Sequence, residues 1–471
     1  MSGRNESSSG REAGRSRLSE SRRAALRTLA VARERKAYVR ELLNSRAGVE
    51  GRSGLSERDA AFAERLALGV AATYGTLDEA IDRHVRRPQA LDPEVRDALR
   101  ISAFELLFLG KEPRVAVSQG VELVRSQAKS ASGLANAVLR RVAEEADAFM
   151  AESRAHRYGL PRWLCDRVTD DLGDAALDEF GRAGLTQAPT YLASVPQWIP
   201  DEEAVQVFAD NGVAVCAAGS VPGAWRASSP RLAVTCPLVT GEDVRAIVTD
   251  YGAQVVAYLA APAPGERMLE VGSGRGTKTI LMAGHTHRRG GAARTWALDV
   301  HEGRSQVAAR RLERARVEGV EQVMGDARDL DSVPGLPAAF ERILLDAPCS
   351  GTGTLRRHPE ITWSLTPEGV DELARSQARM LASCAERLSP GGVITYATCS
   401  VLCEEDEDVV DAFLDSELGS QFEVVPPRDL VDDADAREEL DEHTSPDGYL
   451  RTLVRENGCD GHFCACLRRR A

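Results

Sequence analysis

The chain has 471 residues, of which 28% are charged, and its formal net charge at pH 7 is -13. This length exceeds what one hydrophobic core usually fills, so we expect two or three domains and not a small disulfide-stabilised scaffold. No stretch reaches the roughly 18 to 20 apolar residues of a membrane helix, and the ten cysteines lack the spacing of a zinc site or a disulfide framework. We therefore predict a cytoplasmic protein, a monomer, that binds no membrane and no metal.

The acidic balance argues against a nucleic-acid partner, because phosphate binding needs a basic surface. The charge is uneven, however. Arginines are frequent in residues 1–46, whereas the segments 404–417 and 432–442 hold much of the acid. Acidic runs are usually solvated helix or loop surface, and we interpret these two in that way, which leaves RNA open as a partner.

The first half of the chain predicts a tail and then a helical domain. Residues 1–20 contain almost nothing apolar and are expected to be disordered. Residues 21–150 place apolar side chains at three- and four-residue spacing, as a helical bundle requires, with Pro93 at a helix start and Gly110 at a helix end. Residues 151–245 mix short apolar runs with Pro and Gly, which indicates a smaller α+β connector.

Residues 246–471 predict a different architecture. Short apolar runs such as ERMLEV, RTWALDV, ERILLDAPC and GGVITYATCS alternate with helical patterns. This alternation is typical of a parallel, doubly wound α/β sheet. The fold class is therefore multidomain, with an all-α bundle, an α+β connector and a C-terminal Rossmann-like domain.

A glycine-rich loop follows the first strand of that domain. In LEVGSGRGTKT, Gly272, Gly274 and Gly276 stand between a strand and a helix, where backbone amides can approach a ligand closely. Asp299 ends the next strand and can accept hydrogen bonds from both hydroxyls of a ribose. Asp326 follows the third strand, where a carboxylate can meet the amino group of adenine.

The order of these features favours a nucleoside cofactor over an ordinary tight turn with two surface aspartates. The loop reads Gly-x-Gly-x-Gly and not the Gly-x-Gly-x-x-Gly of dinucleotide sites. S-adenosylmethionine is therefore the predicted cofactor.

Two cysteines come at the carboxyl ends of predicted parallel strands. Cys349 follows Asp346 in Asp-Ala-Pro-Cys, and Cys399 follows Thr398. Ligands of open α/β sheets bind at this edge, so both thiols are candidates for catalysis. A buried cysteine is otherwise most often a small core residue, and we assign Cys216, Cys236 and Cys384 to packing.

A cysteine nucleophile suits methylation at C5 of cytosine. That carbon is a poor nucleophile until a thiolate adds to C6, after which C5 can attack a methyl sulfonium, a base removes the C5 proton and the thiol leaves. Because a free cysteine has a pKa of about 8.5, the site must stabilise the thiolate, and Lys278 or a nearby arginine can contribute. Asp346 can bond the N3 and amino edge of the base.

These residues resemble a known family, the bacterial 16S ribosomal RNA (cytosine-C5) methyltransferases of the RsmB (Sun/Fmu) type. DAPCSGTGTLRRHPEITW at 346–363 resembles the family's fourth motif, and PGGVITYATCS at 390–400 resembles its sixth. The segments LSERDAAFAERLALGV, VAVSQGVELVRSQAK and GLANAVLRRV resemble the NusB-like RNA-binding domain fused in front of these enzymes.

The resemblance implies a role for each motif residue. Cys399 would form the covalent adduct and Cys349 would assist product release, with Asp346 and Lys278 also in the catalytic set. The residues expected to contact the cofactor are Gly272, Ser273, Gly274, Arg275, Gly276, Thr277, Lys278, Asp299, Asp326 and Asp346. Those expected in an RNA groove are Arg356, Arg357 and His358.

The sequence departs from the family at two places. The first motif keeps Lys278 but lacks the family's Pro and one of its Gly residues, and Cys403 stands where the family usually has Pro. Two other functions stay open: an enzyme of the same chemistry that methylates a transfer RNA or another ribosomal cytosine, and an RNA-binding assembly or transcription factor with an inert methyltransferase domain.

Overall fold

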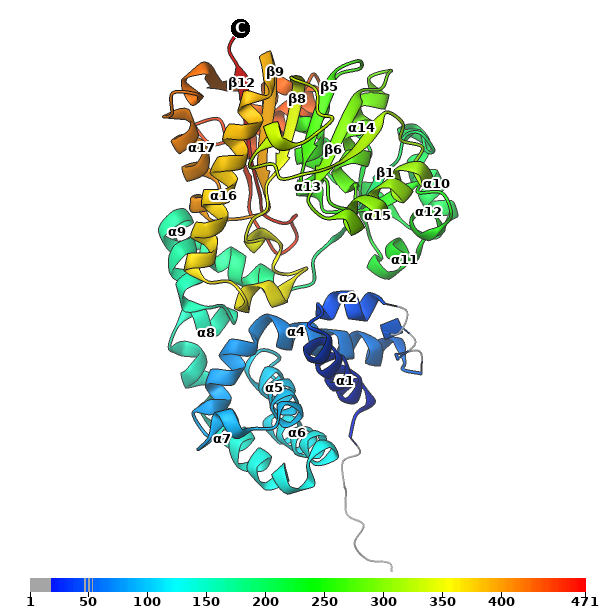
Figure 1. The fold of residues 1–471 in the computed structure, drawn as a ribbon. Coiled ribbons are helices and arrows are strands. Elements are labelled where there is room, and N and C mark those ends of the chain that lie inside the picture. The colour runs from blue at the N-terminus through cyan, green and yellow to red at the C-terminus, as the bar shows by residue number, and fades with distance from the viewer. Residues whose placement is uncertain (1–17, 46–47, 50, 53) are drawn as a thin grey trace, which may run out of the picture. The chain divides into compact units, whose positions relative to one another are not determined.

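A computed structural model describes residues 18–45, 48–49, 51–52 and 54–471, and the expected tail lies outside these residues as far as residue 17. The chain forms two compact units. The helical unit comprises the described residues up to Cys165 together with His358–Trp363, and the α/β unit comprises Asp166–Arg357 and Ser364–Ala471 (Figure 1). Leu18 to Glu20, which we expected in the tail, are ordered: Leu18 is buried, and Ser19 caps the first helix.

The helical unit follows the predicted apolar periodicity. Its helices are α1 (Glu20–Arg35), α2 (Val39–Asn44), α4 (Glu57–Asp82), α5 (Pro93–Leu107), α6 (Pro113–Gln127), α7 (Ser132–Ala151) and α8 (Arg154–Tyr158). Ser56 and Asp92 accept hydrogen bonds from the first turns of α4 and α5, which offsets the free amides of a helix start. Leu66, Leu99 and Leu123 are fully buried in one shared core. The bundle is therefore held by the apolar stripes that its sequence shows.

A short segment from the second half of the chain belongs to the helical unit. The 3-10 helix η5 (Pro359–Trp363) lies against α4. The indole Nε1 of Trp363 donates to the carbonyl of Ala72 at 2.8 Å, and its ring lies 5.5 Å from that of Tyr74. Gly75 leaves the space for this ring, because a Cβ there would meet the indole at 2.0 Å. Bulk at Gly75 would displace the segment that follows Cys349 in the chain.

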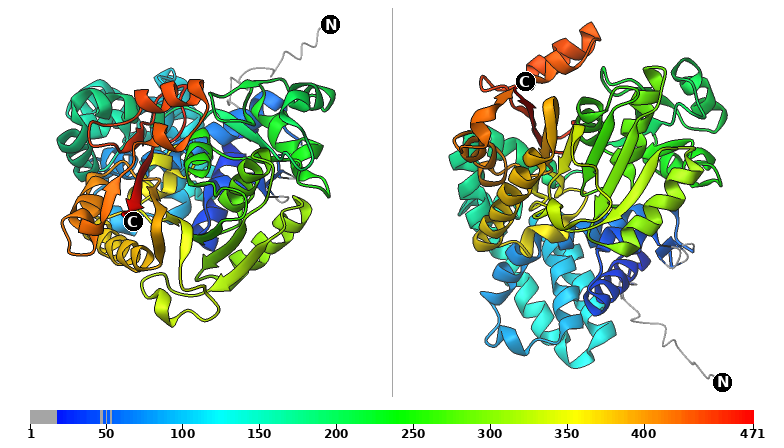
Figure 2. Two further views of the ribbon diagram at one scale, coloured as in Figure 1. Left: turned by 90° about the horizontal axis from the view of Figure 1, so that it is seen from above. Right: turned by 45° about the horizontal axis from the view of Figure 1, so that its top comes forward.

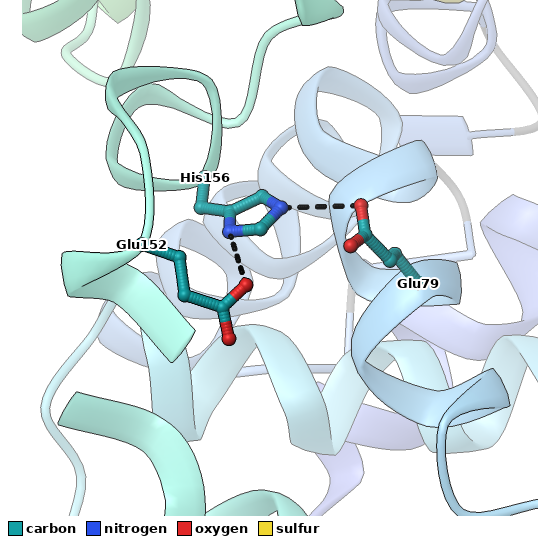
Figure 3. A group of neighbouring side chains, drawn as sticks. All are labelled: Glu79, Glu152 and His156. Atoms are coloured by element: carbon teal, nitrogen blue, oxygen red, sulfur yellow. Dashed lines mark hydrogen bonds and ion pairs between the residues drawn. The ribbon is translucent and has the colours of Figure 1, made fainter. Parts of the chain in front are cut away.

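A cluster in the helical unit has ligand types that metals use, and ion pairs account for it. Figure 3 shows Glu79, Glu152 and His156 gathered together. Both carboxylates also accept hydrogen bonds from Arg83, and the Nδ1 of His156 lies 3.0 Å from the carbonyl of Phe149. The guanidinium of Arg83 supplies the positive charge that a metal ion would otherwise bring to the two carboxylates, so we assign this cluster to stability.

The α/β unit contains a small antiparallel sheet in the order β2-β3-β1-β4. Its strands are β1 (Thr190–Ser194), β2 (Val215–Ala217), β3 (Ala224–Ala227) and β4 (Ala246–Val248), and its helices are α9 (Arg162–Gly184), α10 (Asp201–Asp210), α11 (Pro230–Thr235) and α12 (Pro237–Thr240). Leu192, Phe208 and Val213 fill its core. Helix α9 bends at Gly173, whose φ of 84° is left-handed.

The large sheet has the order β10-β12-β9-β8-β5-β6-β7, with β11 paired to β12. Its strands are β5 (Arg267–Val271), β6 (Arg294–Asp299), β7 (Val320–Met324), β8 (Phe340–Asp346), β9 (Leu388–Thr398), β10 (Phe422–Val424), β11 (Leu450–Thr452) and β12 (His462–Arg469). The five strands from β5 to β9 are parallel, as predicted. The antiparallel strands β10, β11 and β12 were not predicted, so the sheet is mixed.

Helices cover both faces of the large sheet (Figures 1 and 2). They are α13 (Tyr251–Ala260), α14 (Thr277–Arg288), α15 (Glu302–Arg314), α16 (Pro367–Glu386), α17 (Glu407–Leu414) and α18 (Ala434–Glu442). One face packs Leu345 and Tyr396 against α16 and α17, and the other packs Leu344 and Ala397 against α13. No helix in the described part of the chain is long and apolar enough to span a membrane.

We expect the helical unit to depend on one buried ion pair. Arg22 of α1 donates two hydrogen bonds to Glu105 of α5, whose side chain is 0% exposed. Glu105→Ala leaves the guanidinium without a carboxylate in the core and should lower the free energy of unfolding by roughly 3 to 5 kcal/mol in urea denaturation. Glu20→Ala, which removes an exposed pair with Arg23, should cost less than about 1 kcal/mol. Equal losses in the two variants would contradict this expectation.

Candidate active site

The glycine loop forms the turn from β5 into α14. Gly272, Gly274 and Gly276 have φ values of 79°, 55° and 75°, all in the left-handed region that favours glycine. At Gly272 space is also limiting, because a Cβ there would lie 2.4 Å from the carbonyl oxygen of Asp346 on the neighbouring strand. The loop therefore brings bare backbone to the strand edge, where a ligand can approach it closely.

Asp299, at the end of β6, lies beside this loop. It is 6% exposed, and its two carboxylate oxygens accept hydrogen bonds from the amides of Gly274 at 2.9 Å and His301 at 2.7 Å. The hydroxyl of Ser273 is buried and has no hydrogen-bond partner among the described residues. A polar ligand at this loop would supply that missing partner. These positions fit the nucleoside of S-adenosylmethionine.

Other predicted cofactor residues are held by protein contacts. Arg311 of α15 donates to the carbonyl of Arg275 at 2.8 Å and to the hydroxyl of Thr277 at 2.9 Å. These two hydrogen bonds hold the loop on both sides of Gly276. Asp326 follows β7, and its carboxylate accepts hydrogen bonds from Arg328, which lowers its pKa. Asp326 is therefore ionised near neutral pH.

Lys278 and Asp346 form an ion pair at the edge of the sheet. The Nζ of Lys278, in the first turn of α14, donates to Asp346 at the end of β8 at 2.7 Å. Burial opposes the charge of Lys278, but Asp346 and then Cys399 outweigh it and raise the pKa of the ammonium above its ordinary value. A permanent positive charge thus lies next to the strand ends that carry the cysteines.

The structure brings Cys349 and Cys399 together. Their sulfur atoms are 3.3 Å apart, and the amide of Cys399 donates to the sulfur of Cys349, also at 3.3 Å. Both residues are half-buried. The contact with Cys399, together with burial, raises the pKa of Cys349 well above its ordinary value, so Cys349 keeps its proton near neutral pH.

Arg356 is buried and Arg357 is half-buried, in contrast to the place in an RNA groove that we expected for both. Arg356 is 3% exposed and donates to Asp460 at 3.0 Å and to the carbonyl of Arg455 at 2.9 Å. Arg357 contacts Asp460 and, at 2.8 Å, Asp250. Their charges are paired with buried carboxylates, which removes support for direct phosphate binding by these two side chains.

His358 lies in the helical unit, where its ring is 6.0 Å from that of Tyr38.

The acidic segment 404–417 is partly internal, which corrects our interpretation of it as solvated surface. Glu405 and Asp406 are 0% exposed. Asp406 accepts a hydrogen bond from Thr398 and pairs with Arg451 at 3.1 Å, and burial raises its pKa to about 8. Glu405 contacts the residue that follows each cysteine, Ser350 and Ser400. Sequence reasoning missed these contacts because charge content alone does not show where a carboxylate points.

His462 is a second residue that sequence reasoning missed. The pairing of Phe463 with Thr398 places His462 across from Cys399 on the adjacent strand. It is 5% exposed, its Nδ1 lies 4.0 Å from Asp250, and burial lowers its pKa. His462 is the first residue of β12, HFCACLRR, whereas the predicted site residues were found because they follow the last residue of a parallel strand.

Among the cysteines that we assigned to packing, Cys236 and Cys384 are buried but Cys216 is exposed on β2, so the packing role was wrong for Cys216.

Comparison with known proteins gives a consistent result. The family model for the 16S rRNA methyltransferase RsmB/F matches residues 257–468, and the NusB family matches residues 19–144. A putative methyltransferase from Mycobacterium tuberculosis is 32% identical over 96% of this chain and 97% of its own length. The ribosomal RNA small subunit methyltransferase B of Thermus thermophilus is 30% identical, covering 77% of this chain and 80% of its own length.

Solved structures agree on the fold. The crystal structure of PH0851 has a TM-score of 0.74 at 21% identity and covers 96% of this chain and 99% of its own. NSun6 from Pyrococcus horikoshii has a TM-score of 0.55 at 16% identity and covers 66% of this chain and 98% of its own.

The buried carboxyl beneath the glycine loop should make stability depend on pH. Burial raises the pKa of Glu270 from 4.5 to about 7. The raised pKa of Asp406 lowers the free energy of unfolding over the same pH range, and Glu270 adds its own contribution. Between pH 4.5 and 7 the folded protein keeps a proton on Glu270 that the unfolded chain has lost, so this residue alone should contribute a fall of about 3 kcal/mol in the free energy of unfolding.

Glu270→Gln keeps an acceptor for Thr279, which now donates to Glu270 at 2.6 Å, and should remove this fall. Urea unfolding at several pH values checks the slope. Glu302→Gln, at an exposed position, should keep the wild-type slope. The same slope in Glu270→Gln and wild type would contradict the assignment.

Proposed function

Because the chain belongs to the RsmB/F family of 16S rRNA methyltransferases and is an RNA methyltransferase that uses S-adenosylmethionine, we propose that it methylates C5 of a cytosine in 16S ribosomal RNA through a covalent bond between Cys399 and C6. The observation that carries this proposal is the contact between two sulfur atoms, 3.3 Å apart, beside the Lys278–Asp346 pair. The reaction needs one thiol that attacks C6 of the base and a second group that helps this thiol to leave. Both thiols lie at the carboxyl ends of β8 and β9.

The proposed reaction begins with the thiolate of Cys399. Its sulfur adds to C6 of the base, and electron density moves to C5, which becomes nucleophilic. When S-adenosylmethionine is bound, it supplies the electrophilic methyl group. A base then takes the proton from C5, the bond between C6 and sulfur breaks, and the thiolate returns.

The surrounding residues suit these steps. The ammonium of Lys278 stabilises negative charge on Cys399, and Asp346 holds Lys278 while its second oxygen is available to the amino edge of cytosine. Cys349 keeps its proton, so it can donate to the departing sulfur without competing with Cys399 for C6. The glycine loop and Asp299 would hold the nucleoside of the cofactor.

Two features of the chain support ribosomal RNA as the substrate. The relatives with about 30% identity over most of their length include small-subunit ribosomal RNA methyltransferases. The chain also carries the NusB-family helical unit in front of the methyltransferase domain. Within this proposal the helical unit binds RNA and the α/β unit performs the chemistry.

The central test separates the two cysteines. We would incubate the protein with labelled S-adenosylmethionine and unmodified small-subunit rRNA and locate methylated cytosines by bisulfite sequencing. Cys399→Ala should lower methyl transfer by more than about 10³-fold because it removes the nucleophile. Cys349→Ala should accumulate a protein–RNA adduct that survives denaturing electrophoresis. Cys216→Ala, at the exposed position on β2, should retain wild-type transfer.

Each part of the proposal has its own contrary result. Methyl transfer to transfer RNA but not to ribosomal RNA would overturn the substrate and leave the chemistry standing. Full activity in Cys399→Ala would overturn the covalent mechanism. Tight RNA binding without methyl transfer to any RNA would favour an RNA-binding assembly or transcription factor.

A further inference from the structure

The backbone beyond β8 and β9 is where the two reactive thiols lie. The pairing of these strands ends with Asp346 opposite Ala397, and the amide of Ala347 makes the last ladder contact with the carbonyl of Ala397 at 2.9 Å. Cys349 and Cys399 come after this point. Their separation therefore depends on contacts other than the sheet ladder.

One buried carboxylate connects the two segments. Glu405 lies in the 3-10 helix η6 (Cys403–Glu405) and is 0% exposed. Its Oε1 accepts the amide hydrogen of Ser350 at 2.8 Å, and its Oε2 accepts the hydroxyl hydrogen of Ser400 at 2.7 Å. Ser350 directly follows Cys349, and Ser400 directly follows Cys399. Each oxygen of one side chain thus holds the residue next to one thiol.

Gln377 of α16 extends this connection. Its amide nitrogen donates to Oε1 of Glu405 at 3.1 Å and to the carbonyl of Pro348 at 2.9 Å. Cys349 is therefore fixed on both sides, through Pro348 and through Ser350. The amide of Ser350, the amide of Gln377 and the hydroxyl of Ser400 all donate to Glu405, so its two oxygens act here as acceptors.

A backbone contact also joins the segments, but further along the chain. The amide of Gly353 donates to the carbonyl of Cys399 at 2.9 Å. Gly353 lies four positions after Cys349, whereas Glu405 binds the immediate neighbours of both cysteines. The hydroxyls of Ser350 and Ser400 also lie 3.3 Å apart, and the amide of Cys399 donates to the sulfur of Cys349. Glu405 adds to these contacts a buried side chain whose two oxygens each bind the residue after one cysteine.

We propose that Glu405 is a positioning residue that sets the separation of the Cys349 and Cys399 thiols. Its kinetic consequence rests on the proposed function, because the separation matters only if both thiols act on one base. Misplacement of a catalytic group by about 1 Å can cost about 10²-fold in rate.

The first test is kinetic and uses Glu405→Gln, which keeps the size of the side chain but replaces one acceptor by a donor. That donor must face either the amide of Ser350 or the hydroxyl of Ser400, and the bridge is weakened at one end. We expect kcat for RNA methylation to fall by about 30- to 100-fold, with KM for RNA and Kd for S-adenosylmethionine within about threefold of wild type.

The second test measures the thiols directly and needs no RNA. Diamide takes two electrons and two protons from a pair of thiols, which forms a disulfide and a hydrazine. The two sulfurs at 3.3 Å should react rapidly in the wild type, and the linked peptides can be quantified by mass spectrometry. In Glu405→Gln we expect the Cys349–Cys399 bond to form about tenfold more slowly. A loss of stability alone would not slow it in a protein that still binds the cofactor.

The matched control is Glu404→Gln. Glu404 precedes Glu405 in the same 3-10 helix but pairs with Arg167 and not with a cysteine segment. It should leave both kcat and the rate of disulfide formation unchanged. Ser400→Ala removes one end of the bridge together with the contacts of this hydroxyl to Ser350 and Thr352, so it should lower kcat and the rate of disulfide formation at least as much as Glu405→Gln.

Three results would overturn the proposal: an unchanged rate of disulfide formation in Glu405→Gln, an unchanged kcat in an otherwise active enzyme, or an equal effect of Glu404→Gln. If Glu405→Gln does not bind S-adenosylmethionine, Ser400→Ala decides by the same two measurements. If the wild type methylates no RNA, the proposed function fails, and the rate of disulfide formation still decides whether Glu405 sets the thiol separation.

Discussion

The pairing of β8 with β9 is the interaction on which the rest of the site depends. Parallel pairing aligns Asp346 with Ala397, so the residues that follow both strands leave the sheet at the same edge. The neighbouring strand β5 delivers the glycine loop and Lys278 to that edge. The glycine loop with Lys278, Asp346 and Cys399 therefore each follow or end one strand of the sheet, and these strand ends lie side by side. A one-residue slip between β5 and β8 would turn Asp346 away from Lys278 and break the ion pair.

Buried carboxylates beside this edge change the meaning of the net charge. Glu270, Glu405 and Asp406 are at most 1% exposed, and each has a hydrogen-bond donor within the protein. Burial favours the neutral form of Glu270 and Asp406. Part of the formal charge of -13 is therefore interior and never meets a substrate. The acidic composition is a weaker argument against an RNA partner than it is for a protein with solvated acids.

Local patterns predicted the parts of the site that local chain geometry determines. The glycine loop, Asp299 and both cysteines could be found because each follows a strand whose apolar run is readable in the sequence. The short strands β10 and β11 have three residues each and carry no comparable signal. Glu405 and Gln377 could not be found, because their function comes from partners 28 to 55 positions away along the chain. Pattern reasoning identifies where a strand ends but not which distant side chain holds that end in place.

For Arg356 and Arg357 the sequence showed the positions but not their buried partners, Asp460 and Asp250. Arg356 and Arg357 share Asp460, and Arg357 also contacts Asp250 at the start of α13, so they tie the segment after Cys349 to β12 and α13. A phosphate that drew Arg357 outward would take the guanidinium away from buried Asp250, at a cost of roughly 3 to 5 kcal/mol, and one that drew Arg356 outward would leave Asp460 with one arginine in place of two. An ion pair with a phosphate at an exposed position stabilises by less than this cost, typically by about 1 kcal/mol or less. The two arginines therefore stabilise the loop that carries Cys349, and RNA recognition near the site must depend on cations that are not already committed to buried acids.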